Sequence, residues 1–295
     1  IFGIDVDLPG MVHGTVRMSP RFGASVASAD TTAAETMPGV IKIVKLETNY
    51  GAGFGVIAET TWAAFKAAEA IEVEWDDAPY PRDSEAIMKV FRTAAAGDWR
   101  GSSWRDDGDV ETAFADAPAD SVLTADYEVP YLAHATMEPM NATAQFKDGR
   151  LEIWAPNQMP TILQMVCGPL AGVDADAVTV NTTYLGGGFG RRGEADFAIY
   201  ATLLALETDG RPVKVTWTRE EDTTHDAYRP AAAGRFRARI GGDGMPEAVD
   251  MRVATPSLIK SIGKRLFPSF PAGGPERLLT EGAFDQPYTI ADIVV

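Results

Sequence analysis

The chain has 295 residues, of which 45% are hydrophobic and 23% are charged, an ordinary globular composition with room for two hydrophobic cores. Its formal net charge of −16 argues against nucleic acid or an anionic membrane as partner, because both would repel it. The single cysteine, Cys167, excludes an internal disulfide and a cysteine metal site, and we expect it to be a small buried side chain. The chain starts without Met and ends within a strand-like run, so we expect a piece of a longer protein.

The first 80 residues alternate short strands with two short helices, which is typical of a compact α+β domain. We expect strands over residues 11–18, 24–29, 40–46, 55–58 and 71–75, and helices that begin near Asp30 and at Thr60 or Thr61.

Residues 81–120 change composition and read as a long connector between two domains. A helix is predicted from Ser84 to Ala95, capped by Asp83 or Ser84. Two tryptophans, Trp99 and Trp104, stand in a polar stretch, so we expect the connector to pack against the larger domain.

A second domain is expected over residues 121–295. A strand over residues 121–130 opens it, and a hairpin over residues 141–155 turns at Asp148-Gly149. The further predicted elements are a helix from Pro160 to Leu170, strands over 178–184 and 212–218, a helix over 194–207 and a hairpin over 235–254. Residues 255–295 mix Pro, Gly and basic residues and give the weakest pattern.

A glycine-rich run, Tyr184-Leu-Gly-Gly-Gly-Phe-Gly-Arg-Arg-Gly193, lies between the strand over 178–184 and the helix over 194–207. Glycines can adopt positive φ and let a ligand approach the backbone closely. Successive N–H groups and the start of a helix would together bind an oxyanion or a pyrophosphate. A tight turn without ligand is the alternative, but three glycines followed by Phe-Gly-Arg-Arg exceed what a turn needs.

The motif alone does not identify the ligand. No Gly-Lys-Ser/Thr follows, so a Walker phosphate loop is excluded. Residues 188–193 satisfy G-x-G-x-x-G, which leaves an NAD site open. The strand over 178–184 is more polar than the first strand of a Rossmann fold, however, and that weakens this alternative.

His134 and Glu138 are four residues apart and would share one face of a helix. Such a pair suits metal binding or acid/base chemistry, although one histidine and one carboxylate are too few to hold a metal. A buried hydrogen-bonded pair is the simpler hypothesis, and Pro139 would break any helix there.

Several motifs resemble one known family. Residues 11–75, with Met37-Pro38-Gly39-Val40 and Trp62-Ala63-Ala64, resemble the α/β hammerhead domain of the xanthine dehydrogenase/aldehyde oxidase family. The runs over residues 134–141, 154–160, 186–192, 212–214 and 219–222 resemble the first part of its molybdopterin-binding domain. The Met-Glu-Pro and Phe-Gly-Arg-Arg variants are most similar to the isoquinoline 1-oxidoreductase β-subunit branch, which includes aldehyde dehydrogenase subunits.

The resemblance implies an α+β fold in three parts. These are a hammerhead domain over residues 1–80, a connector over 81–120, and the truncated N-terminal portion of a molybdopterin-binding domain of mixed sheets and helices over 121–295.

The resemblance also implies molybdopterin cytosine dinucleotide as cofactor, with molybdenum bound by the dithiolene of the cofactor and not by protein side chains. In the family, backbone N–H groups of the glycine loop contact the molybdenum oxo ligand, which corresponds here to Phe189 and Gly190. The same side of the site would be lined by Gly187, Gly188 and Arg191, and His134 and Glu138 would lie beside the cofactor.

The implied reaction is hydroxylation of an aromatic N-heterocycle or an aldehyde with oxygen from water. Electrons would leave through a partner subunit with 2Fe-2S iron–sulfur clusters. The family's general-base glutamate belongs to a motif absent from this chain, so we expect it in the remaining C-terminal part and expect this part alone to be inactive. Gly193 stands where a xanthine-type enzyme has a substrate-orienting glutamate, which makes purines unfavourable substrates.

Two other functions stay open at this point, an NAD-dependent dehydrogenase that uses residues 188–193 and a non-catalytic interaction fragment. The sequence does not decide between the bacterial periplasm and cytoplasm.

Overall fold

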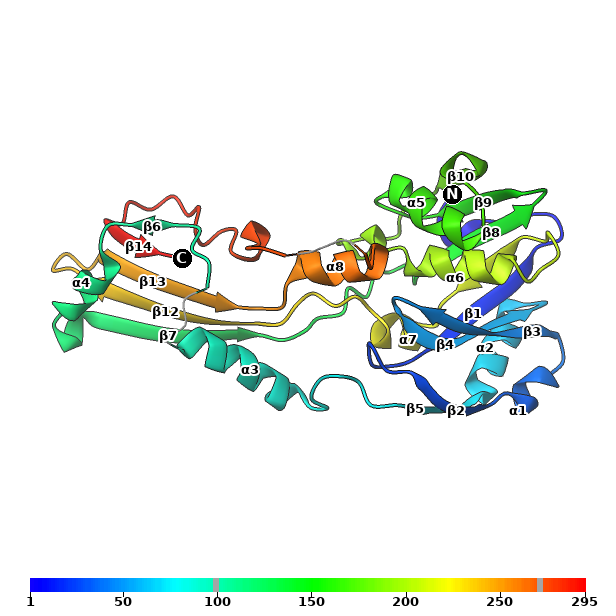
Figure 1. The fold of residues 1–295 in the computed structure, drawn as a ribbon, viewed down its shortest axis with the longest axis horizontal. Helices are drawn as coiled ribbons and strands as arrows, with labels where there is room; N and C mark the ends of the chain where they lie inside the picture. The colour runs from blue at the N-terminus through cyan, green and yellow to red at the C-terminus, as the bar shows by residue number, and fades with distance from the viewer. Residues whose placement is uncertain (98–100, 270–272) are drawn as a thin grey trace. The chain divides into compact units, whose positions relative to one another are not determined.

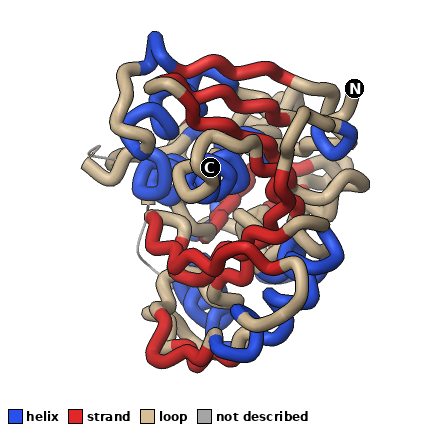
Figure 2. The backbone as a smooth tube through the Cα atoms, turned by 90° about the vertical axis from the view of Figure 1, so that its right-hand side faces the viewer, coloured by secondary structure: helices blue, strands red, loops and turns tan. Residues whose placement is uncertain are grey.

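The computed structural model describes residues 1–97, 101–269 and 273–295 (Figure 1). It divides into two compact units, one formed by Ile1–Pro79 and Ala133–Tyr228 and the other by Tyr80–Leu132 and Arg229–Val295. Each unit combines helices with sheets, which confirms the predicted α+β class; Figure 2 distinguishes the two kinds of element by colour. Among the described helices, none is both long and apolar enough to span a membrane.

The first unit is built on a seven-stranded sheet with the order β10-β9-β8-β11-β1-β4-β3. Its central pairing is parallel, between β1 and β11, with His13 opposite Lys214. The strands are β1 (Val12–Met18), β3 (Val40–Thr48), β4 (Gly51–Ala58), β8 (Asn141–Lys147), β9 (Arg150–Ala155), β10 (Val178–Thr182) and β11 (Val213–Thr216). A separate two-stranded sheet pairs β2 (Val26–Asp30) with β5 (Glu72–Trp75).

Helices cover both faces of this sheet. On one face, α2 (Thr61–Ala70) packs against β1 and β4, with Thr60, one of the two predicted caps, accepting a hydrogen bond from the Ala63 N–H. The other face carries α6 (Asp196–Ala205), whose Leu204 would lie only 2.5 Å from a Cβ at Gly55. The unit also contains α1 (Thr32–Glu35), α5 (Pro160–Leu170) and α7 (Arg219–Thr224), together with the 3-10 turns η1 (Gly3–Asp5), η3 (Ala175–Ala177) and η4 (Arg191–Gly193). The helix α5 packs on α6.

The helix α6 is buried on nearly all sides, whereas its sequence predicted one buried face through Phe197, Ala201 and Leu204. Those three side chains are buried as expected. The remaining burial arises because α5 packs against the helix in addition to the sheet.

The second unit is built on a five-stranded sheet with the order β6-β14-β13-β12-β7. The strands β12 and β13 pair antiparallel, as the hairpin prediction expected. The strands are β6 (Asp106–Asp107), β7 (Val122–Val129), β12 (Ala232–Ile240), β13 (Pro246–Ala254) and β14 (Asp292–Val294); the helices are α3 (Ser84–Ala96), α4 (Val110–Ala115) and α8 (Leu258–Leu266), with the 3-10 turns η2 (Ala119–Ser121) and η5 (Arg277–Leu279).

The compact units cut across the predicted ranges 1–80, 81–120 and 121–295, because β1 pairs with β11 in one sheet. The range 81–120 contributes α3, α4 and β6 to the second unit, so it is more than a linker. The backbone N–H of Trp104 donates to the Val295 carbonyl at 2.9 Å, whereas Trp99 lies outside the described residues.

Candidate functional site

The glycine loop leaves β10 and packs its first glycines against the segment over residues 136–138. A Cβ at Gly186 would lie 2.3 Å from the Cβ of Glu138, and one at Gly188 would lie 3.0 Å from Oε1 of Gln158. Only glycine permits the first of these approaches. At Gly186 the loop therefore lacks a side chain because it packs against Glu138.

The tip of the loop, Phe189 and Gly190, has a different character. Both residues are in the left-handed region, with φ of 54° and 96°. Phe189 is 76% exposed. A Cβ at Gly190 would meet nothing within 4 Å. No hydrogen bond within the described ranges engages the backbone N–H of either residue. The tip thus combines two N–H groups that have no partner within the described ranges with open space at Gly190.

The two arginines that follow the tip point into the protein. Arg192 is fully buried; its Nε donates to the Gly187 carbonyl at 2.8 Å, and its Nη2 donates to the Glu138 carbonyl at 2.7 Å and to Glu138 Oε2 at 3.1 Å. Arg191 is 1% exposed and makes a bidentate pair with Asp196 at 2.8 and 2.6 Å. Neither guanidinium is available to a ligand in this arrangement, although Arg191 was predicted to line the site.

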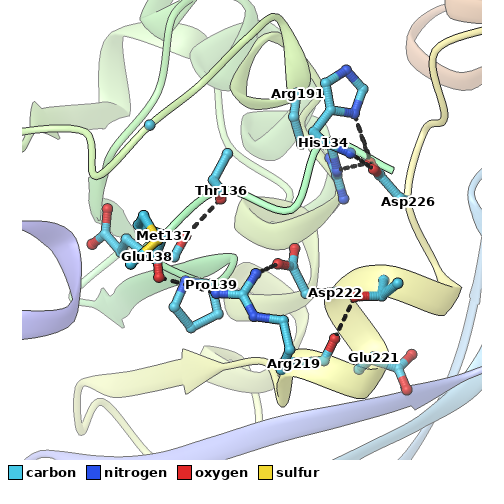
Figure 3. Close-up of polar contacts among 12 residues, drawn as sticks. His134, Thr136, Met137, Glu138, Pro139, Arg191, Arg219, Glu221, Asp222 and Asp226 are labelled. Atoms are coloured by element: carbon cyan, nitrogen blue, oxygen red, sulfur yellow. Dashed lines mark hydrogen bonds and ion pairs between the residues drawn. The ribbon is translucent and has the colours of Figure 1, made fainter. Parts of the chain in front are cut away.

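A second carboxylate, Asp226, joins Arg191 to His134 (Figure 3). Oδ1 of Asp226 lies 2.7 Å from Nε of Arg191. Oδ2 of Asp226 accepts from the backbone N–H of His134 at 2.6 Å and lies 3.0 Å from Nδ1 of His134. Burial raises the pKa of Asp226, but the hydrogen bonds from His134 and the charge of Arg191 outweigh it and lower the pKa overall. The imidazole of His134 is therefore oriented by an ionised carboxylate.

His134 and Glu138 share no helix face, and the simpler hypothesis, that they form a hydrogen-bonded pair with each other, is wrong. Residues 131–140 form no helix, Ala135 has φ of 44°, and Pro139 follows. The two side chains turn to different partners, His134 to Asp226 and Glu138 to the ends of the glycine loop.

The predicted anion site at the start of the following helix is also wrong. That helix begins at Asp196, and its N-cap Ala195 is buried and donates its N–H to the Tyr50 hydroxyl at 3.2 Å. Asp196 is itself buried against Arg191. An NAD pyrophosphate therefore has no access to this helix end, which removes the main support for the dehydrogenase alternative.

Two residues of the site, Asp226 and Asn157, were not predicted from the sequence. Asp226 lies 92 residues from His134, so no local spacing signals it. Asn157 is 3% exposed; its Nδ2 donates to the Arg192 carbonyl at 2.7 Å, and its Oδ1 accepts from the Met159 N–H at 2.6 Å. An asparagine directly after a strand and a proline was the available signal for such a loop-bracing side chain.

Comparison with known proteins defines the class of this site. A family model described as the molybdopterin cofactor-binding domain matches residues 94–257, a range that includes the glycine loop. The chain belongs to the molybdopterin cofactor-binding domain family.

The relatives point to the branch that the motifs predicted. The membrane-bound aldehyde dehydrogenase (pyrroloquinoline-quinone) of Gluconacetobacter polyoxogenes is 32% identical over 263 residues, which cover 86% of this chain and 33% of that protein. Isoquinoline 1-oxidoreductase subunit beta of Brevundimonas diminuta is 28% identical, covering 81% of this chain and 31% of that protein. The predicted family resemblance is thereby confirmed.

A solved structure shows the same fold. Quinoline 2-oxidoreductase from Pseudomonas putida 86 superposes with a TM-score of 0.67 at 21% identity, over 85% of this chain and 36% of that chain. The chain thus spans about a third of the length of the relatives it matches.

Proposed function

We propose that this chain is the N-terminal portion of the cofactor-binding subunit of a molybdenum hydroxylase that oxidises an aldehyde or an aromatic N-heterocycle with oxygen from water. The family match and the relatives named for aldehyde and isoquinoline oxidation support this reaction class. The observation that carries the proposal is the loop tip, where Phe189 and Gly190 are exposed residues and no hydrogen bond within the described chain uses their N–H groups.

The loop tip fits such a cofactor. The open space over Gly190 admits a bulky group, and two adjacent backbone donors suit an oxygen that carries negative charge. When bound, the molybdenum cofactor would supply the centre that accepts two electrons from the substrate carbon. Phe189 and Gly190 would donate hydrogen bonds to it, and Gly187 and Gly188 would complete the bare surface beside it.

We also propose the form of the cofactor, the electron acceptor and the place of the general base. The cofactor is molybdopterin in its cytosine dinucleotide form, the electron acceptor is a 2Fe-2S partner subunit, and the general base lies in the remaining C-terminal part of the same subunit. Gly193 offers no polar side chain beside the tip, which favours aldehydes or simple heterocycles over purines.

The first test is cofactor analysis of the complete subunit, expressed with an iron–sulfur partner in a host that makes the cofactor. Near-stoichiometric molybdenum together with cytidine monophosphate after acid hydrolysis is the expected result. Because one relative is named for pyrroloquinoline quinone, that compound is measured as well. Folded protein that contains pyrroloquinoline quinone, or neither group, would overturn the proposal.

A matched pair of variants tests the loop tip. Gly190 and Gly282 both have positive φ, 96° and 87°, and a Cβ at either meets nothing within 4 Å. Alanine should therefore cause similar backbone strain at both positions. We expect Gly190→Ala to lower molybdenum retention and turnover, while Gly282→Ala keeps both. Equal effects would refute a role of the tip in cofactor binding.

A further inference from the structure

The carboxylate of Glu138 binds both ends of the glycine loop. Its Oε2 accepts from the Gly186 N–H at 2.9 Å, where the loop begins, and lies 3.1 Å from Nη2 of Arg192, where the loop ends. Its Oε1 accepts from the Ile4 N–H and from Nδ2 of Asn141, each at 3.0 Å. Four donors use its lone pairs, and its side chain is only 5% exposed. Glu138 therefore acts inside the protein and not directly on a ligand.

Arg192 closes the same loop from the other side. Its Nε bonds to the Gly187 carbonyl, and its Nη2 bonds to both the carbonyl and the carboxylate of Glu138. One buried ion pair thus fixes the backbone on both sides of the tip. Because charged hydrogen bonds are shorter and stronger than neutral ones, this pair is a stiff connection.

The tip needs such a connection. Phe189 has φ of 54°, a conformation that a residue with a Cβ seldom adopts unless its surroundings hold it there. Its own side chain is exposed, so its packing supplies little of that constraint. The constraint comes from the fixed ends of the loop, at Gly186, Gly187 and Arg192.

We propose that Glu138 and Arg192 are positioning residues that hold the N–H groups of Phe189 and Gly190 in the orientation in which they donate to the bound cofactor. The inference rests on the proposed function. It replaces the predicted direct contact of Glu138 with the cofactor by an indirect one, transmitted through the loop backbone.

The test substitutes Glu138→Gln in the complete, cofactor-loaded subunit with its partner. This change preserves volume but removes the negative charge and places an amide NH₂ opposite the donors of Gly186 or Arg192. The matched control is Asp250→Asn, which neutralises another buried carboxylate, one paired with Arg252 in the second unit.

Three measurements separate positioning from general stability. Amide hydrogen exchange of the peptide over residues 184–193 should accelerate in Glu138→Gln and stay unchanged in Asp250→Asn. The g-values of the molybdenum(V) electron paramagnetic resonance signal should shift in Glu138→Gln alone. Its kcat should fall roughly tenfold to a hundredfold at nearly constant KM, since misplaced donors act on the reaction and not on substrate binding.

Each possible result of these measurements either supports or overturns the positioning role of Glu138 and Arg192. Faster exchange with parental g-values and parental kcat would overturn the inference. If Glu138→Gln does not fold, Arg192→Lys is the second variant, which retains the charge but loses the Nε bond to Gly187. We expect the same changes in hydrogen exchange, g-values and kcat, at smaller size. Their absence would overturn the inference as well. A parent protein without molybdenum would refute the proposed function and the inference with it, whereas molybdenum with unshifted variant spectra refutes the inference alone.

Discussion

Replacing Arg191 by methionine should strongly destabilise the first unit. The variant keeps an unbranched apolar chain in place of the arginine stem but removes the guanidinium from between Asp196 and Asp226, whose side chains are each 1% exposed. Removing one partner of a buried ion pair typically costs about 3–5 kcal/mol, because the remaining charge is left buried without a counter-ion. Asp226 keeps its two hydrogen bonds from His134, so most of the cost should come from Asp196.

The assay is thermal unfolding, with a second variant to assign the cost. A loss of this size corresponds to a Tm lower by roughly 6–20 °C in a unit of about 150–250 residues. Adding Asp196→Asn to Arg191→Met should recover roughly 2 kcal/mol, since the orphaned charge is then gone. The control Arg235→Met removes an exposed pair with Asp126 and should leave Tm unchanged. If Arg191→Met lowers Tm no more than Arg235→Met does, the buried ion pairs of Arg191 do not stabilise the first unit.

Three more predictions concern packing, pH and thiol chemistry. Gly186→Ala places a Cβ 2.3 Å from that of Glu138 and should cost about 1–3 kcal/mol or more, whereas Gly193→Ala meets only ordinary contacts; equal Tm values would contradict this packing. Burial raises the pKa of Glu221 from 4.5 to about 8, so the folded state retains a proton that the unfolded state releases, and stability falls as pH rises through that window. Glu221→Gln should lack this fall in Tm measured between pH 5 and 9, and a parallel pH dependence in both proteins would argue against the burial of the carboxylate. Cys167 is buried, which raises the pKa of its thiol to about 12, so it should react with Ellman's reagent only after unfolding; rapid labelling of the native protein would disprove this.

Much of the fold followed from local signals. The Asp148-Gly149 hairpin is present, with both residues at positive φ, and Asp83 caps α3 by accepting from the Ala86 N–H. These features depend on the conformational preferences of a few neighbouring residues, which the sequence states directly. The family resemblance extended this local prediction to the cofactor class, which the family match bears out.

The partners of His134 and Glu138 could not be predicted from their spacing in the sequence. Their spacing suggested a helix, but each side chain is bound by a residue far away in the sequence. Asp226 is 92 residues from His134, and Arg192 is 54 residues from Glu138. Spacing rules apply only after the secondary structure is known, and here long-range ion pairs hold an irregular segment in place.

The sequence by itself determined that residues 186–193 form a loop with a bare backbone, because glycine removes the steric limits on φ wherever it occurs. Only the tertiary structure decided what each glycine is for. Gly186 accommodates the side chain of Glu138, whereas Gly190 borders open space at the exposed tip. Glu138 and the loop meet because β8 and β10 belong to the same sheet, and such contacts depend on how distant segments pack.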